Sequence, residues 1–180
     1  EFGPGIGSSL SRDAGFSLDG VQALHSNKGL ACEGVKTLGM GFVLEPSEAI
    51  ALIEKDSRNI NIIRPFINGD DVNSKPDQSP SRYVIDFFDL PDDRASEYSD
   101  CWTIIQERVK PERQRLKDDG EFALRNPLPQ RYWQFGDSRF KFRKKISKLD
   151  RIIVAVQTSK YIAPCFLPNE MIFSQALVMI

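Results

Sequence analysis

Residues 60–71 read Ile60-Asn61-Ile62-Ile63-Arg64-Pro65-Phe66-Ile67-Asn68-Gly69-Asp70-Asp71 and join an apolar stretch to a polar one. The apolar stretch ends at Ile67. Asn68-Gly69-Asp70-Asp71 is a strong turn signal, because asparagine, glycine and aspartate accommodate or stabilise turn conformations. We therefore expect a loop to begin at Asn68. Residues 71–82 carry almost no apolar side chains, which predicts that this loop is long and polar.

Helix and strand signals alternate on both sides of this stretch. Residues 40–44 and 83–88 are typical of strands, and residues 46–55 of a short helix with a proline at its start. In residues 92–117 apolar side chains recur at helical spacing, and Pro111 predicts a kink or a second helix. A basic helix is expected at 138–149 and strands at 151–157, 161–167 and 171–180. The mixture predicts an α+β fold, with a mixed sheet, several flanking helices and no internal repeat.

The domain organisation follows from composition. Residues 1–38 are rich in glycine and serine and predict an extended lead-in, partly derived from cloning. Gly3, Gly5 and Gly7 resemble a phosphate-binding loop, but such a loop needs a strand before it and a helix after it, so a flexible end is expected. Residues 39–180 form the expected domain. Because the sequence ends within the apolar run Leu177–Ile180, we expect this domain to be truncated at its C-terminal end.

Composition excludes several classes of protein. The 180 residues are 41% hydrophobic, enough for an ordinary soluble core. No apolar run approaches the ~20 residues of a membrane helix, and no secretory signal is visible, so a cytoplasmic protein without a membrane partner is expected. The three cysteines are far apart, and there is one histidine. This predicts neither a disulfide framework nor a zinc site.

The formal net charge of -1 conceals a polarised chain. Residues 1–106 hold 9 Lys/Arg and 17 Asp/Glu, a difference of 9 - 17 = -8, whereas residues 107–151 hold 14 and 7, a difference of 14 - 7 = +7. Clustered basic groups determine nucleic-acid affinity more than the total charge does. The basic segment is therefore either a nucleic-acid surface or a solvated helix face.

Arginines and aromatic residues alternate in the basic segment, as in Arg131-Tyr132-Trp133-Gln134-Phe135. Arginine suits phosphate oxygens and the guanine edge, and lysine supplies point charge to the backbone. Trp133 and Phe135 are also typical core residues. The candidate DNA-binding residues are Arg82, Arg113, Arg125, Arg131, Arg139, Lys144, Lys145 and Lys160, with Asn73 and Gln78 as weaker candidates.

We expect no catalytic, cofactor-binding or metal-binding residue in this chain. Asp70, Asp71, Asp86 and Asp89 could hold magnesium, as in a metal-dependent nuclease, but a nuclease would also have a lysine close to the second carboxylate. Cys101 has no histidine nearby in sequence to activate it. Asn126-Pro127-Leu128-Pro129 lacks the adjacent prolines and the aromatic residue with which adenine methyltransferases hold a flipped base.

Several strings in this order and spacing resemble the target recognition domain of MmeI-like type IIG restriction-modification enzymes. The similarity covers roughly residues 30–180, and its strings are Gly39-Met40-Gly41-Phe42-Val43-Leu44, Glu48-Ala49, Asn59, residues 64–73, Ser81-Arg82-Tyr83-Val84-Ile85-Asp86-Phe87, Val109-Lys110-Pro111-Glu112-Arg113, Arg131-Tyr132-Trp133-Gln134-Phe135, Arg139 and Thr158-Ser159-Lys160. Tyr132-Trp133 stands where the family has a Trp-Trp pair.

The resemblance implies a target-recognition-domain-like fold that reads a short asymmetric site in double-stranded DNA. It also implies a bacterial parent chain with a nuclease domain and an S-adenosylmethionine-dependent adenine methyltransferase domain. The recognition domain would position DNA for that methyltransferase domain, and S-adenosylmethionine and Mg²⁺ would belong to the parent chain. Two alternatives stay open from the residues: a domain that docks other parts of a restriction-modification complex, and a metal-dependent nuclease.

Overall fold

The structure is a computed structural model, and it describes residues 25–180. The chain divides into two compact units, of which the second runs from Ala31 to Ile180. In the first unit, His25–Asn27 form a short 3-10 helix, η1. Gly3, Gly5 and Gly7 lie outside the described residues, as does most of the expected lead-in. Residues 31–38, which we expected to belong to the lead-in, are part of the second unit.

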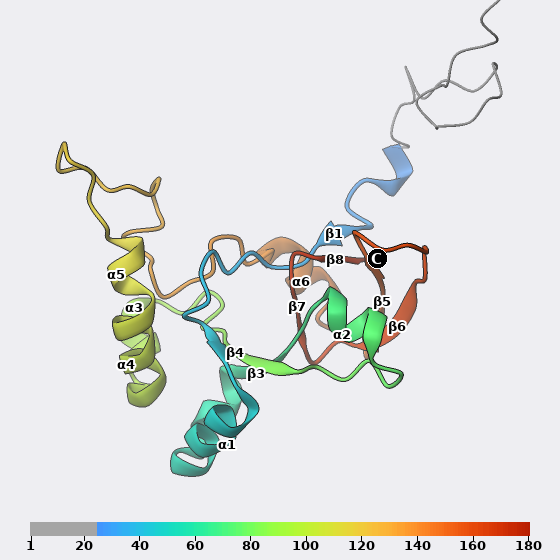
Figure 1. Ribbon diagram of the computed structural model, residues 1–180, viewed down its shortest axis with the longest axis horizontal. Coiled ribbons are helices and arrows are strands. Elements are labelled where there is room, and N and C mark those ends of the chain that lie inside the picture. Colours follow the sequence, from blue (N-terminus) through green and yellow to red (C-terminus); the bar gives the residue numbers. More distant parts are fainter. Residues whose placement is uncertain (1–24) are drawn as a thin grey trace, which may run out of the picture. The chain divides into compact units, whose positions relative to one another are not determined.

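The second unit alternates short strands and helices (Figure 1). In chain order its elements are β1 (Cys32–Glu33), β2 (Val43–Leu44), α1 (Pro46–Lys55), η2 (Ser57–Asn61), β3 (Ile63–Ile67), α2 (Gly69–Ser74), β4 (Arg82–Ile85), α3 (Asp92–Ala95), α4 (Ser99–Arg108), α5 (Lys110–Arg113), α6 (Phe140–Ile146), β5 (Arg151–Val156), β6 (Cys165–Pro168), β7 (Ile172–Phe173) and β8 (Leu177–Met179).

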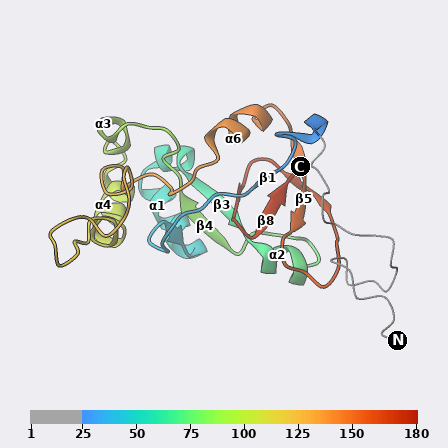
Figure 2. The same ribbon diagram turned by 90° about the horizontal axis from the view of Figure 1, so that it is seen from above.

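The strands form two four-stranded sheets. The first sheet has the order β2-β4-β3-β7 and is mixed, because β3 and β7 are parallel and its other pairs are antiparallel. The second sheet, β1-β8-β5-β6, is antiparallel throughout. Figure 2 shows α6 and α2 on opposite sides of this second sheet. The predicted α+β class with a mixed sheet is confirmed, and a second sheet is present that the sequence did not predict.

The parallel strands β3 and β7 separate two hydrophobic cores. Phe66 pairs with Ile172, and both lie in the larger core beneath α1, α3 and α4. The next residues, Ile67 and Phe173, also pair, and they lie in the smaller core of the second sheet. Successive side chains of a strand point to opposite faces. One strand pair therefore contributes to both cores.

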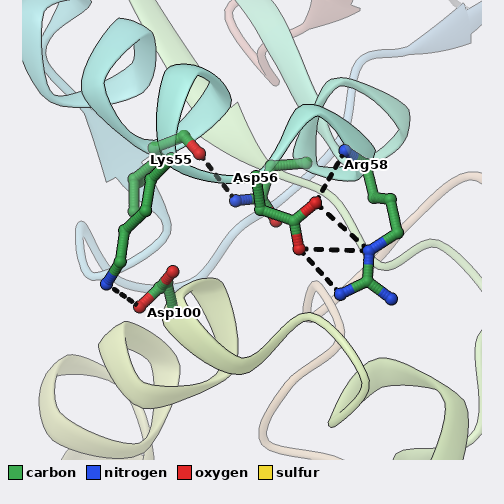
Figure 3. A network of polar contacts seen from close by, with 6 residues as sticks. Lys55, Asp56, Arg58 and Asp100 are labelled. Atoms are coloured by element: carbon green, nitrogen blue, oxygen red, sulfur yellow. Dashed lines mark hydrogen bonds and ion pairs between the residues drawn. The ribbon is translucent and has the colours of Figure 1, made fainter.

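Two ion pairs stabilise the helices around the larger core (Figure 3). One links two helices, and the other is local. Lys55 at the end of α1 donates to Asp100 at the start of α4, with a distance of 2.6 Å between Nζ and Oδ1. The Asp56 carboxylate accepts hydrogen bonds from the side chain and the backbone N–H of Arg58, and these lower the pKa of Asp56. Asp56 is also the N-cap of η2, so the same carboxylate begins the next helical turn.

The prediction of a loop at Asn68 is wrong, because α2 begins there. The Asn68 side chain accepts hydrogen bonds from the backbone N–H groups of Asp70 and Asp71, and Asp71 accepts one from the backbone N–H of Asn68. This reciprocal capping box satisfies N–H groups that a helix start leaves unpaired. The polar loop is therefore shorter than expected, and it follows α2 as residues 75–81.

Asp71 holds this loop against the helix. Its side chain is 3% exposed and forms an ion pair with Lys75 at 3.1 Å. Burial acts to raise the pKa of the Asp71 carboxyl, but hydrogen bonds from Ser81, the backbone of Asn68 and Lys75 outweigh burial, so the pKa is lowered. The ionised carboxylate thus ties the start of α2 to the residue that precedes β4.

Most other helices and strands agree in type with those predicted from the sequence, but they differ in length. The helix at 46–55 and the proline-broken helices of 92–117 are confirmed as α1 and α3–α5, and the basic helix is confirmed as the shorter α6. Residues 161–164, expected to start a strand, are instead an exposed loop before β6. Within residues 25–180, none of the helices has the length and apolarity needed to cross a bilayer.

We predict that Asp71→Ala lowers the free energy of unfolding by about 1–3 kcal/mol at pH 7, because buried donors lose a charged acceptor. The folded-state pKa lies below the ordinary value of 3.8. The stabilisation is therefore complete above about pH 5 and is lost as the pH falls through the folded-state pKa. Urea unfolding of wild type, Asp71→Ala and the exposed control Asp70→Ala at pH 7 and pH 3 checks this. If Asp71→Ala lowered the free energy of unfolding equally at both pH values, this prediction would be contradicted.

Candidate nucleic-acid interface

Helix α6 presents a basic face to solvent. Residues 141–151 hold six basic residues and one acidic residue. Lys141, Lys144, Lys145 and Lys148 are exposed. The spacing of three and four residues places Lys141, Lys144 and Lys145 on one side of α6, and Lys148 lies in the turn that follows the helix. On the other side, Phe142 and Ile146 pack into the smaller core. We call the four lysines the α6 basic face.

Arg143 fixes the orientation of this helix. Its guanidinium donates to the buried Asp86 carboxylate just after β4 and lies 4.5 Å from the centre of the Phe88 ring. The Phe88 ring in turn stacks on Phe140 of α6, with 5.0 Å between ring centres and 26° between planes. Arg143 therefore acts inside the fold, whereas the four lysines around it are exposed at the surface.

A cavity of ≈ 560 Å³ lies between α6 and the first sheet. Phe88, Phe140 and Met171 give it apolar walls, and Arg143 and Lys144 line its edge. Carboxylates of Asp86, Asp89 and Glu170 also line it. Because residues of both charge signs line the cavity, the cavity itself does not select an anion, whereas the α6 basic face carries one sign of charge.

A second polar group forms at the opposite end of β5, where α2 meets the loop of residues 157–164, which we call the β5–β6 loop. Ser159 Oγ donates to Asn73 Oδ1 at 3.4 Å. Gly69 permits the close approach of α2, because a Cβ atom at this position would lie 3.1 Å from Cγ1 of Val156. Lys160 is exposed, with its Nζ 5.2 Å from the centre of the Tyr161 ring. The structure thus brings Asn73 into contact with Ser159, the residue before Lys160, although the two are far apart in sequence.

Arg113 is a structural residue and not the DNA contact that we expected. Its side chain is 0% exposed, and one Nη donates to the carbonyl oxygen of Thr37. Its Nε and other Nη have no partner among the described residues. Burial lowers the pKa of the guanidinium. A side chain without exposed area cannot reach a phosphate, so this candidate is withdrawn.

Arg139 is mostly occupied by interactions within the protein. Its guanidinium pairs with Glu33 at 2.6 Å and with Asp137 at 2.8 Å, and its Nε donates to the carbonyl oxygen of Gly34. The residue is the N-cap of α6 and has a φ of 52°. These contacts join the start of α6 to β1, which is a structural role.

The remaining candidates are exposed or partly exposed, and they are dispersed over the chain. Arg82 begins β4 and lies 4.0 Å from a Glu45 carboxylate oxygen. Arg125 and Arg131 lie in the turns between α5 and α6, and Gln78 in the loop before β4, with a φ of 52°. Lys144 and Lys145 are neighbours on α6. The candidates chosen from the sequence did not include Lys141 or Lys148, although both belong to the same basic stretch as Lys144 and Lys145.

The aromatic residues that alternate with arginines in sequence belong to the larger core. Tyr132, Trp133 and Phe135 are all buried. Trp133 Nε1 donates to the carbonyl oxygen of Leu90 at 3.0 Å, and Gln106 donates to the Tyr132 hydroxyl at 2.8 Å. The core interpretation of Trp133 and Phe135 is confirmed, and these rings do not form a base-stacking surface.

Two of the four acidic residues considered for a nuclease have structural partners. Asp71 completes the capping box of α2, and Asp86 accepts from Arg143 and from the backbone N–H of Phe88. Among residues 25–180, no group of three or more His, Cys, Asp or Glu side chains is arranged to hold a metal ion. Burial first, and then the nearby carboxylates of Asp100 and Asp56, raises the pKa of Cys101 to about 12, so its thiol stays protonated.

Comparison with known proteins found a similarity of fold and none of sequence family. No protein-family model matches the sequence, and no curated protein matches it either. A solved structure of the Type IIL restriction-modification enzyme MmeI in complex with DNA is similar in fold, with a TM-score of 0.61 and 14% sequence identity. The similarity covers 83% of this chain and 19% of the MmeI chain. The matched part of this chain therefore spans about a fifth of the length of the MmeI chain.

We predict that Arg113→Met leaves the thermal midpoint unchanged or raises it, because the methionine fills a similar volume without a buried, incompletely paired charge. Arg113→Ala should lower the free energy of unfolding by about 2–5 kcal/mol by leaving a cavity beside Phe42. Calorimetry of both variants measures this difference. A strong destabilisation by Arg113→Met would show instead that the bond to Thr37 outweighs the burial of the charge.

Proposed function

We propose that this chain is a sequence-specific recognition module for double-stranded DNA within a restriction-modification enzyme. The observation that carries the proposal is the α6 basic face, whose lysines are exposed and lie within a segment of six basic residues and one acidic residue. Clustered lysines bind phosphates as point charges and release counterions from DNA. The fold shared with part of MmeI, an enzyme solved with DNA, supports the same assignment.

In this proposal the chain itself has no catalytic centre. It positions target DNA for a separate methyltransferase domain of a parent enzyme of type IIG, which would use S-adenosylmethionine to methylate adenine and Mg²⁺ to cleave. The buried or paired states of Asp71, Asp86 and Cys101 support a non-catalytic role, because each of these candidate groups is committed to the fold.

We expect Lys141→Gln/Lys144→Gln/Lys148→Gln to weaken binding of a random duplex and to make it less sensitive to salt. The slope of log K against log salt should become shallower by about 0.9 for each lysine that contacts a phosphate. Fluorescence anisotropy at about 50 and about 200 mM salt spans the range in which phosphate contacts dominate. Sequencing the retained duplexes shows whether a short motif is enriched.

The matched comparison is Arg115→Gln/Arg125→Gln/Arg131→Gln, which removes the same charge from the segment between α5 and α6. A larger effect of this second variant would move the interface away from α6. A wild-type chain that binds no duplex at either salt concentration would refute the proposed function itself.

A docking domain is the second candidate. It is favoured by Phe166, which is 59% exposed on β6, a strand at the edge of the second sheet. An exposed aromatic residue on an edge strand is a feature that protein interfaces use. Tight binding of a methyltransferase domain without any DNA affinity would favour this candidate.

A further inference from the structure

The β5–β6 loop carries the most exposed large apolar side chain among the described residues. Ile162 is 95% exposed and Tyr161 is 68% exposed. Other exposed rings of the second sheet have partial cover: the Arg151 guanidinium lies 4.6 Å from the centre of Phe166, and Lys160 Nζ lies 5.2 Å from that of Tyr161. Ile162 has no such cover, so the free energy that burial of an isoleucine provides is not gained within this chain.

The surroundings of Ile162 favour an anionic partner. Residues 151–168 contain Arg151 and Lys160 and no aspartate or glutamate. Thr158 and Ser159 precede Lys160 and supply hydroxyl groups, and Ser159 bonds to Asn73 of α2. Hydroxyl and amide groups hydrogen-bond to phosphates and base edges, and a cation attracts the backbone.

The base of this loop is firmly placed. Backbone hydrogen bonding continues past β5, since the N–H of Gln157 donates to the carbonyl oxygen of Ala176 at 2.9 Å. On the other side, β6 pairs with β5 through four residue pairs from Arg151–Pro168 to Val154–Cys165. The apolar tip therefore projects from a paired hairpin, which lowers the entropic cost of ordering it against a ligand.

We propose that Ile162, together with Tyr161, enters a groove of the bound duplex and contacts the bases there, while Lys160 and Ser159 hold the adjacent phosphates. This proposal rests on the proposed function and deepens it, because it names a specificity-determining contact. Apolar side chains that enter DNA grooves contact thymine methyl groups or wedge between base steps. Specificity then comes from Ile162, while the lysines supply affinity that does not depend on sequence.

The test separates apolar contact from charge by measuring affinity and salt slope together. Ile162→Ser should weaken binding of an enriched duplex by about tenfold, as expected for about 1.4 kcal/mol of lost apolar contact, with an unchanged salt slope. Lys160→Gln should make the slope shallower by about 0.9, because one phosphate contact disappears. The control Ile60→Ser, at a position 60% exposed in η2, should leave both quantities unchanged.

A spectroscopic measurement locates the contact on the DNA. In one series, 2-aminopurine is placed at successive positions of the duplex and its fluorescence is measured. In a second series, uracil replaces each thymine in turn and the affinity is measured. In at least one series, one position should respond to wild type and not to Ile162→Ser. Equal affinity of wild type and Ile162→Ser, in a chain that binds DNA through α6, would overturn the inference and leave the proposed function intact. If Ile162→Ser instead abolishes binding of a methyltransferase domain while DNA binding is unchanged, the loop is a protein-docking element and the inference is wrong.

Discussion

The arrangement of the described fold depends on one strand, β3, whose last two residues are buried in different cores. In β3, Phe66 packs into the larger core and Ile67 into the smaller one, and β7 repeats the pattern with Ile172 and Phe173. A shift of one residue in this pairing would exchange the two faces, so the register is strongly constrained. Asn68 follows immediately and begins α2. Through Gly69, α2 packs on Val156 and so lies beside the β5–β6 loop.

The orientation of α6 depends on contacts at three neighbouring positions. Arg139 joins its start to Glu33 and Gly34 near β1, Phe140 stacks on Phe88, and Arg143 binds Asp86 after β4. Gly34 itself allows the chain to pass close to β7, since a Cβ atom there would lie 2.2 Å from the carbonyl oxygens of Phe173 and Ser174. The helix is thus attached to both sheets, and its lysines are directed to solvent as a consequence of contacts made by its other side.

Sequence patterns predicted the elements whose signals are local. Pro46 marked the start of α1, and the apolar stripe of residues 95–109 marked α3 and α4, because both signals depend on neighbouring residues. The six residues of α2 are too few to show a helical period, so Asn68-Gly69-Asp70-Asp71 was interpreted as a turn although Asn68 and Asp71 form a capping box. The second sheet was missed because its strands are two to six residues long and pair across large sequence separations.

In the candidate site, too, some residues could be predicted from local sequence and others depend on the tertiary structure. The lysines of α6 follow from helical spacing, whereas burial decides the role of each arginine, and burial is a tertiary property. Arg113, Arg139 and Arg143 are used inside the fold, and the planar guanidinium groups of Arg139 and Arg143 each bond more than one acceptor. On α6 this leaves compact, strongly hydrated ammonium groups at the surface, which attract any phosphate backbone alike. In the proposed DNA complex, uncharged groups that reach the bases would add discrimination between sequences, and in the described residues the β5–β6 loop with Asn73 offers such groups together.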